Sequence, residues 1–312
     1  MRTVVAYESG RDGFWLARLL RGHAIEVYVI HASSVAVSRE QRRAKTDRLD
    51  TEMLMRALLG WLRGEPGHCR MVAIPTIAQE DARRPGRERE GLVAERTRLT
   101  NTIKAELALW GIQGFKPGLR KAAEHLEALR TVEGEPLPPN TLARLHRLLK
   151  RRTLISDQIK AIELATAQAI ERDPTGPNAM VLLLARIKGI GLETAQMLVH
   201  EVLSRNLRDR RAVARYAGLT GTPDESGSKR REKGISKAGN PRVRCGLIQL
   251  AWRFLMFQPD AALVQWYRER TAGGKGAIKK TMIVALARKL LIALWNYAAA
   301  GVMPEGVVLK EA

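Results

Sequence analysis

Residues 224–244 form the stretch whose composition most directly suggests chemistry. From Lys229 to Arg244 it holds seven Lys or Arg side chains against a single acid, Glu232. Serines and glycines are interspersed, and glycines let a phosphate approach backbone N–H groups closely. The stretch ends in Asn240-Pro241, which is typical of a helix N-cap followed by the first helical residue. This combination predicts a flexible cationic loop that leads into a helix N-terminus, the make-up of a phosphate site. A solvated basic turn is the alternative.

The whole chain carries the same excess of positive charge. Its 312 residues include 53 Lys and Arg against 32 acids, which gives a formal net charge of +21 and a pI near 10.7. Such an excess points to a polyanionic partner, and nucleic acid is the usual one. The candidate nucleic-acid contacts in the basic stretch are Lys229, Arg230, Arg231, Lys233, Lys237, Asn240, Arg242 and Arg244.

A pair of carboxylates forms a second candidate site. Asp47 and Asp50 lie three residues apart in a helical pattern that runs from about Arg42 to Leu62, so both project from one face of the helix. Two like charges at this spacing disfavour an isolated helix, whereas a divalent cation such as Mg²⁺ would use them as ligands. The alternative is a solvated face on which neighbouring cations neutralise the pair: Arg43, Lys45 and Arg48.

The N-terminal residues read as a βαβ unit. Two short apolar runs, Thr3–Tyr7 and Ile25–Ile30, flank a helical pattern that Gly22 closes. Such a unit implies parallel strands, helical cover and a ligand site at the carboxyl ends of the strands. Glu8 lies at the carboxyl end of the first run. It is a third candidate acid, although a glutamate that leaves a buried strand is more often a simple surface residue.

Two long amphipathic patterns follow the N-terminal part. The charged segment 80–90, which contains Pro85-Gly86, predicts a loop or hinge. Helices are then expected over Leu92–Trp110 and Thr141–Glu171, separated by a Pro-rich break. They indicate an antiparallel arm, either a coiled-coil surface for oligomerisation or two helices that pack only on each other.

The C-terminal part contains a glycine hairpin between apolar helices. The pattern of a helix–hairpin–helix predicts sequence-independent contacts to DNA phosphates, with a tight αα-turn as the alternative. The candidate contacts here are Lys188, Gly189 and Gly191. Further apolar helices are expected over Pro241–Phe257 and Gly276–Ala300, so this domain is predicted to be helical.

Other features argue for a cytoplasmic protein. The most apolar late segment, Met282–Ala300, is interrupted by Arg288-Lys289 and therefore reads as a buried helix, not a membrane span. The N-terminus has neither a signal sequence nor a lipidation pattern. Cys69 and Cys245 have no metal-ligand spacing and read as free thiols in a reducing compartment.

In this order the features resemble the bacterial insertion-sequence transposases of the one-ten family, the DEDD transposases also described as bridge-RNA-guided serine recombinases. The resemblance spans nearly the whole chain. It rests most specifically on AKTDRLD at 44–50, GIGLETA at 189–195 and YAGLTGTPDESGSKRREKGISKAGNPRVR at 216–244.

The resemblance implies a plan of three parts. These are a partial RNase H/RuvC-like α/β domain at 1–80, a helical coiled-coil arm at 91–172 and an all-helical transposase domain at 178–312. It also implies Mg²⁺ or Mn²⁺ as the cofactor, donor and target DNA as substrates, a structured guide RNA, and a dimer or tetramer.

The resemblance assigns roles to particular residues. By position, Glu8 matches the second acid of the family's metal site, and Asp47 and Asp50 match the third and fourth. Ser226 is the best match to a serine that attacks a DNA phosphodiester and forms a covalent phosphoserine link, with Ser228 and Ser236 as the other serines of the stretch.

One departure from the family pattern concerns the first acid, which in the family precedes the glutamate by some tens of residues. Only seven residues precede Glu8, so we expect an N-terminally truncated domain that binds metal weakly. Two other functions stay open: a nucleic-acid-binding remnant of a transposase, and a RuvC-like nuclease that needs the acids but not Ser226.

Overall fold

The computed structural model describes residues 2–10, 13–31, 34–35, 46–65, 67–226, 229–236, 238–274 and 276–311. Within 222–226 and 229–233, and at residue 277, it describes the backbone only. Two candidate residues, Ser228 and Lys237, lie outside the described residues, as does the expected start of the helix before Thr46. The chain forms two compact units, Met1–Asp81 and Ala82–Ala312.

The first unit is built on a parallel βαβ motif, as the apolar runs predicted. Strands β1 (Val4–Glu8) and β2 (Glu26–Ile30) pair in parallel, and α1 (Trp15–Gly22) connects them. The register places Glu8 opposite Ile30 at the carboxyl ends of both strands. Residues 70–72 add a short antiparallel pairing on the free side of β2, through a hydrogen bond of 2.7 Å from Val72 N to Val29 O.

Helices cover both faces of this small sheet. On one face, Val27 and Val29 are buried in an apolar cluster with Ala17 of α1. Side chains alternate along a strand, so Tyr28 points to the other face, where its ring lies 4.6 Å from that of Trp61 in α2 (Asp47–Leu62). The register then puts Glu8 on the face that α2 covers. A further short helix, α3 (Ile77–Asp81), ends the unit.

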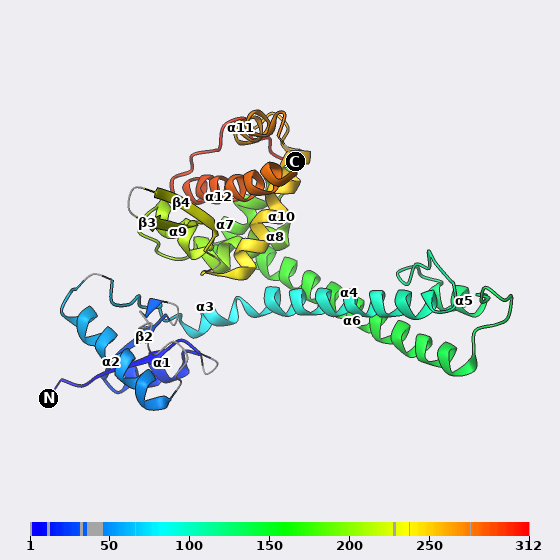
Figure 1. Cartoon of the computed structure of the whole chain (residues 1–312), viewed down its shortest axis with the longest axis horizontal. Coiled ribbons are helices and arrows are strands. Elements are labelled where there is room, and N and C mark those ends of the chain that lie inside the picture. Colours follow the sequence, from blue (N-terminus) through cyan, green and yellow to red (C-terminus); the bar gives the residue numbers. More distant parts are fainter. Residues whose placement is uncertain are drawn as a thin grey trace. The chain divides into compact units, whose positions relative to one another are not determined.

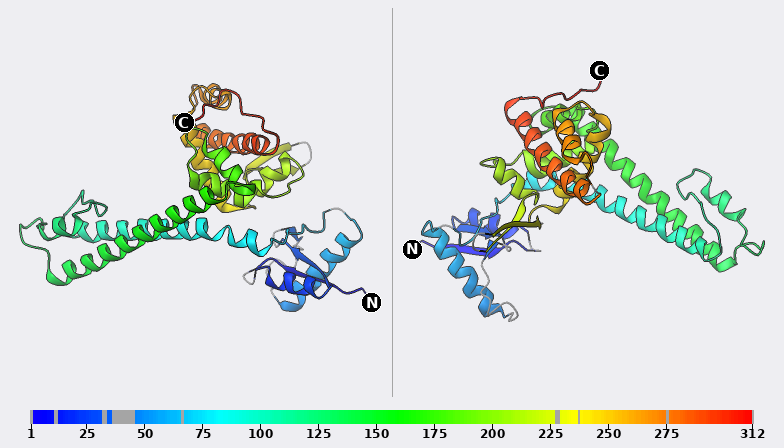
Figure 2. Two further views of the ribbon diagram at one scale, coloured as in Figure 1. Left: turned by 180° about the vertical axis from the view of Figure 1, so that it is seen from behind. Right: turned by 45° about the horizontal axis from the view of Figure 1, so that its top comes forward.

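The second unit begins with a helical arm. Helices α4 (Arg84–Ala108) and α6 (Pro139–Arg172) lie side by side in every view of Figures 1 and 2, with the short α5 (Ala122–Glu127) near the far end. Ile103 and Leu107 pack with Leu145 and Leu149, whereas Leu99 packs with Ile155 and Ile159. Because later residues of one helix contact earlier residues of the other, the arm is antiparallel, as predicted.

The loop or hinge predicted over 80–90 is shorter than expected, because it is confined to a turn at residues 82 and 83, where the boundary between the two units falls. Helix α4 already begins at Arg84, with Pro85 in its first turn. Proline is tolerated there because its missing N–H would have no intrahelical partner. Gly86 is explained by close packing, since a Cβ at this position would lie 2.8 Å from a guanidinium nitrogen of Arg242.

The rest of the second unit is a helical core. It comprises α7 (Gly176–Ala185), α8 (Leu192–Leu198) with a π-helical turn over Val199–Leu203, α9 (Arg210–Tyr216), α10 (Pro241–Phe257), α11 (Ala262–Thr271) and α12 (Gly276–Ala300). One apolar cluster joins all of them, with Phe254 and Leu290 fully buried. The bounds of α10 and α12 agree with the sequence prediction. Ile170 of α6 also belongs to this cluster, so the C-terminal end of α6 packs against the helical core.

The second unit is not all-helical, contrary to our expectation. Two antiparallel strands, β3 (Gly221–Ser226) and β4 (Lys229–Ile235), occupy the stretch that the sequence suggested was a flexible loop. Their register places Asp224 opposite Arg231 and Glu225 opposite Arg230. Opposite charges at paired positions favour such a register, which explains how a polar segment forms a hairpin.

Helix α12 is long and apolar enough, by length and composition, to cross a membrane. In this structure it is a core helix that packs against α10 and α11. Its buried side chains include Leu286, Leu290, Leu291 and Leu294. The expectation of a buried helix is therefore confirmed for the described residues.

Candidate nucleic-acid interface

The basic hairpin places Ser226 at the turn end of β3. In the backbone register Ser226 pairs with Lys229, the first residue of β4. Ser236 lies at the opposite end of the hairpin, where its N–H donates to the carbonyl of Thr220 at 2.9 Å. The backbone therefore separates these two serines by the length of the hairpin, and of the two it is Ser226 that adjoins the cationic start of β4.

Gly239 connects the hairpin to α10 through a very close backbone approach. A Cβ at this position would lie 2.5 Å from the backbone nitrogen of Gly218 and 2.6 Å from the carbonyl oxygen of Tyr216. Real Cβ atoms do not approach backbone this closely, so only glycine fits. The next residue continues the contact, because Asn240 N–H donates to the same Tyr216 carbonyl at 2.7 Å.

Asn240 caps α10, as the sequence predicted. Its side-chain Oδ1 accepts hydrogen bonds from the backbone N–H groups of Arg242 at 3.0 Å and Val243 at 3.3 Å. Its Nδ2 donates to a carboxylate oxygen of Glu201 at 3.0 Å. One side chain thus fixes the start of α10 and links it to the π-helical turn that follows α8.

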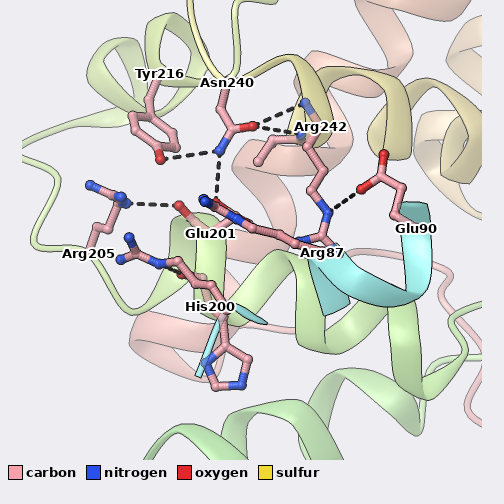
Figure 3. A network of polar contacts seen from close by, with 10 residues as sticks. Arg87, Glu90, His200, Glu201, Arg205, Tyr216, Asn240 and Arg242 are labelled. Atoms are coloured by element: carbon pink, nitrogen blue, oxygen red, sulfur yellow. Dashed lines mark hydrogen bonds and ion pairs between the residues drawn. The ribbon is translucent and has the colours of Figure 1, made fainter. Parts of the chain in front are cut away.

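Glu201 is the centre of a buried polar network (Figure 3), and its side chain is only 1% exposed. Arg87 of α4 donates to both of its carboxylate oxygens, at 2.9 and 3.0 Å. Arg242 donates to it at 3.1 Å and also forms an ion pair with Glu90 of α4. Glu201 therefore joins the base of the arm to the start of α10.

The network keeps Glu201 charged. Burial alone would raise the pKa of its carboxyl, but the hydrogen bonds and charge of Arg87, together with Asn240 and Arg242, hold this pKa below its ordinary value. Burial, and then the charge of nearby Arg83, lower the pKa of His200, which favours a neutral ring. Two further cations of this region, Arg83 and Arg205, donate to the backbone carbonyls of His200 and Glu201.

This network has a consequence for two of the predicted nucleic-acid contacts. The side chain of Arg242 is 18% exposed and bonded to two carboxylates, and Asn240 is occupied as a cap. Both residues already have internal partners. Sequence analysis did not single out Glu201, although an acid between the apolar pairs Leu198-Val199 and Val202-Leu203 is a signal that could have found it.

The glycine hairpin after α7 is tied down by its neighbours. Lys188 N–H donates to the carbonyl of Val308 at 3.1 Å, and the fully buried Gln258 donates to the carbonyl of Lys188 at 2.8 Å. Gly189 has a φ of +92°, and a Cβ there would lie 3.0 Å from that of Phe257. Gly191 is the N-cap residue of α8. Turn geometry and close packing therefore account for glycine at Gly189, and the N-cap position accounts for Gly191.

Of the three candidate acids in the first unit, two lie together in one helical turn. Asp47 and Asp50 lie in the first turn of α2, where carboxylates interact favourably with the helix dipole. This accounts for two like charges on one face without any bound ion. Among the residues that the structure describes, no three His, Cys, Asp or Glu side chains form a group that could hold a metal ion.

The donor chemistry of the aspartate pair nevertheless suits a hard cation. Mg²⁺ commonly takes one or two carboxylates and fills its other positions with water and substrate phosphates. Asp47 is exposed and Asp50 is half-buried, so water and a phosphate can reach this turn. Asp47 and Asp50 therefore fit Mg²⁺ as a two-carboxylate site.

Taken together, an α/β unit and a helical unit that carries a cationic hairpin define a protein suited to handling nucleic acid. Comparison with known proteins specifies the family. Residues 1–110 match the transposase family DEDD_Tnp_IS110, and residues 181–265 match the "Transposase IS116/IS110/IS902 family".

Individual relatives agree with this result. The chain is 46% identical over 317 residues to "Putative transposase y4rJ" of Sinorhizobium fredii, an alignment that covers 99% of this chain and 80% of that protein. It is 26% identical to the "Transposase for insertion sequence element IS1328" of Yersinia enterocolitica, over 94% of this chain and 82% of that protein. The chain belongs to the IS116/IS110/IS902 family of transposases.

Proposed function

We propose that this transposase recombines DNA with Ser226 as the nucleophile. The position of Ser226 carries the proposal: it ends β3, directly opposite Lys229 in a hairpin that the Arg230 and Arg231 positions make strongly cationic. The hairpin lies within the segment that matches the transposase family. A nucleophile for a phosphodiester needs such surroundings, because cations hold the phosphate and stabilise the charge that develops on it.

The proposed step exchanges one ester bond for another. Ser226 Oγ forms a bond to phosphorus, one phosphorus–oxygen bond of the DNA strand breaks, and the released sugar hydroxyl takes up a proton as the serine gives one up. The phosphate ester to Ser226 replaces the phosphate ester that was broken in the DNA, so the number of ester bonds is unchanged. Attack by a second sugar hydroxyl can therefore rejoin the strands without another energy source. Lys229, Arg230 and Arg231 position the phosphate in both steps.

We further propose that the first unit is an RNase H/RuvC-like domain that binds Mg²⁺ or Mn²⁺ through Asp47 and Asp50, with Glu8 as the predicted third acid. The parallel βαβ motif with helices on both faces supports this assignment. Asp47 and Asp50 would hold the ion, and Glu8 lies on the sheet face that α2 covers. When bound, the ion would supply neutralisation of phosphate charge.

DNA choice through a guide RNA and assembly of protomers through the arm complete the proposal. The formal net charge of +21 supports contacts with more than one polyanion. The arm helix α6 exposes two large apolar side chains, Leu154 and Leu164, each 60% exposed, which is consistent with a self-association surface.

The test is to trap the covalent intermediate. The full chain is incubated with Mg²⁺, donor and target DNA and the transcript of the element's own end, and protein–DNA adducts are resolved under denaturing conditions. An adduct should form with the wild type and vanish in Ser226→Ala. It should persist in Ser228→Ala and Ser236→Ala, which are matched controls. An adduct in Ser226→Ala would show that the nucleophile is another residue.

A second function, nucleic-acid binding without strand cleavage, is favoured by one observation. The described residues hold no three-ligand metal group. On this alternative, binding weakens with salt, Mg²⁺ changes little and no strand is cut. Cleavage that needs Mg²⁺ but persists in Ser226→Ala would instead indicate a RuvC-like nuclease.

A further inference from the structure

A basic groove on the helical core lies apart from the hairpin tip and the Glu201 network. It is a hollow of about 640 Å³ between α9, the start of β3, α11 and the middle of α12. Five cationic side chains line it: Arg210, Arg211, Arg215, Arg288 and Lys289. Among the described residues that line the groove, none has an acidic side chain.

The cations of the groove are available to a ligand. Arg210, Arg211, Arg215 and Lys289 are exposed, and Arg288 is half-buried. Within the described part of the chain, none of the five takes part in an ion pair, whereas the arginines around Glu201 are paired. Lys289 also lies over the ring of Trp266, with its ammonium 4.7 Å from the ring centre. Because no carboxylate balances the five cations around the hollow, they repel one another, and a bound polyanion would relieve this repulsion.

The floor of the groove is apolar. Ala214 of α9, Leu263 of α11, and Ile292 and Ala293 of α12 form it, and all four are buried or half-buried. Ile292 and Ala293 follow Arg288 and Lys289 by four residues, so the floor and the cations lie on one face of α12. Asn296 continues this face and offers a side-chain amide to a polar group at one end of the floor.

We propose that this groove binds an unpaired nucleotide of a single nucleic-acid strand, with phosphates on the cations and a base on the apolar floor. Phosphates need the charge, and a planar base gains from apolar burial and from stacking on arginine guanidinium planes. A DNA duplex would need only a flat basic surface for its phosphates. Its bases are stacked inside the double helix and cannot enter a hollow. An acidic protein segment would pair with the cations, but its carboxylates would not cover the apolar floor, which has the size of a base.

The inference rests on the proposed function in one respect, that the partner is nucleic acid. Either DNA or RNA could supply the strand, since both present phosphates and unpaired bases. The site differs from the proposed reaction centre, because no residue of the groove is assigned a part in the phosphoryl transfer. The two claims can therefore fail separately.

A charge placed in the floor tests the groove. Ala293→Glu sets a carboxylate among the five cations while keeping all of them. Ala165→Glu, on an exposed position of α6, makes the same change of net charge away from the groove and is the matched control. Thermal unfolding of both full-length variants checks that each is folded.

Binding is measured by fluorescence anisotropy with 20-nucleotide single-stranded DNA, single-stranded RNA of the same length and a 20-base-pair DNA duplex. Ala293→Glu should weaken binding of at least one single strand about tenfold, while duplex binding and the Ala165→Glu control should change less than about twofold. The strand type that loses affinity identifies whether DNA or RNA uses the groove.

A charge-removal pair checks the phosphate contacts. For a single strand, Arg211→Ala/Arg215→Ala should make the negative slope of log affinity against log salt shallower by about 1.4, since each phosphate contact contributes about 0.7 to its magnitude. Lys279→Ala/Lys280→Ala, exposed on α12 outside the groove, should not. Equal effects of variant and control would overturn the inference, as would equal weakening of duplex and single strands.

The outcome also separates the two claims. A wild-type chain that binds no nucleic acid would remove the basis of the proposed function and of the groove together. If the wild type forms the covalent adduct while Ala293→Glu and Ala165→Glu bind single strands alike, the groove is wrong and the function stands.

Discussion

At the scale of single residues, Glu201 decides how the second unit holds together. Its carboxylate receives hydrogen bonds from Arg87, Arg242 and Asn240, which come from two parts of the chain more than 150 residues apart. A buried carboxylate is costly to desolvate and is tolerated only when paired. Here the pairing connects the arm to the helix that follows the cationic hairpin.

Glu201 should give the second unit a characteristic dependence on pH. Its folded pKa lies below the ordinary value of 4.5, so the unfolded carboxyl binds a proton first as the pH falls. Its contribution is therefore complete above about pH 4.5 and is lost as the pH falls further, through the folded pKa. Glu201→Gln should lower the free energy of unfolding by about 2 kcal/mol at neutral pH, with a smaller difference from wild type in acid.

Urea denaturation of the full chain at several pH values measures this effect, with the second unit followed by hydrogen exchange. Glu269→Gln, exposed on α11, serves as the control and should leave the profile unchanged. A difference between Glu201→Gln and wild type that stays constant from pH 7 to pH 3 would contradict the assigned role.

Single residues also show how far the sequence could be interpreted. Asn240 and Pro241 were predicted correctly, because capping depends on neighbours in the chain. The roles of Gly239 and Glu201 depend on Tyr216 and Arg87, which only the fold brings near. The sequence could therefore mark Glu201 as an acid among apolar residues, but it could not identify its partners. Whether Ser226 acts as the nucleophile stays a prediction.

At the scale of elements, the basic hairpin depends on how it returns to the core. Gly239 lies against the end of α9 so closely that no side chain fits. Gly239→Ala should therefore destabilise the second unit by about 1–3 kcal/mol, the usual cost of overpacking. The hairpin and α10 would lose their shared anchor.

The matched control is Gly91→Ala. Gly91 lies inside α4, and a Cβ there meets nothing within 4 Å. Alanine in a helix interior is favoured over glycine by about 1 kcal/mol, so this variant should be as stable as wild type or more so. Chemical denaturation followed by circular dichroism measures both; equal effects of the two substitutions would show that Gly239 has no special packing role.

Elements whose pattern is periodic were predictable, and those that depend on pairing were not. The arm helices and α12 follow from apolar spacing alone. The hairpin was missed because its strands are polar and short, and its signal lies in the opposite charges at paired positions. Two residues, Gly-Ser, separate the strands, and this is itself a hairpin signal that could have been used.

At the scale of the whole molecule, positive charge is the dominant property. The net charge of +21 predicts that affinity for duplex DNA of any sequence falls steeply with salt. The slope of log affinity against log salt should be about −0.9 for each phosphate contacted. Titrations at several salt concentrations with two unrelated duplexes give this slope. A slope near zero would contradict binding through the phosphates.

The arrangement into an α/β unit and a helical unit could be anticipated, because βαβ and helical periods differ clearly in the sequence. The metal site could not be assessed in the same way. Carboxylates from separate elements must meet in space, and sequence spacing reports only on the pair within α2. The groove between α9 and α12 was equally hidden, since its cations lie about 75 residues apart in the chain.

The central claim is that Ser226 becomes joined to DNA, and peptide mapping of the trapped adduct tests it most directly. Trypsin separates the candidates, because Ser226 and Ser228 lie in the peptide Tyr216–Lys229, whereas Ser236 lies in Gly234–Lys237. After nuclease trimming, electron-transfer fragmentation should place a nucleotide on Ser226. A nucleotide on Ser228, Ser236 or any residue outside the hairpin would contradict the claim.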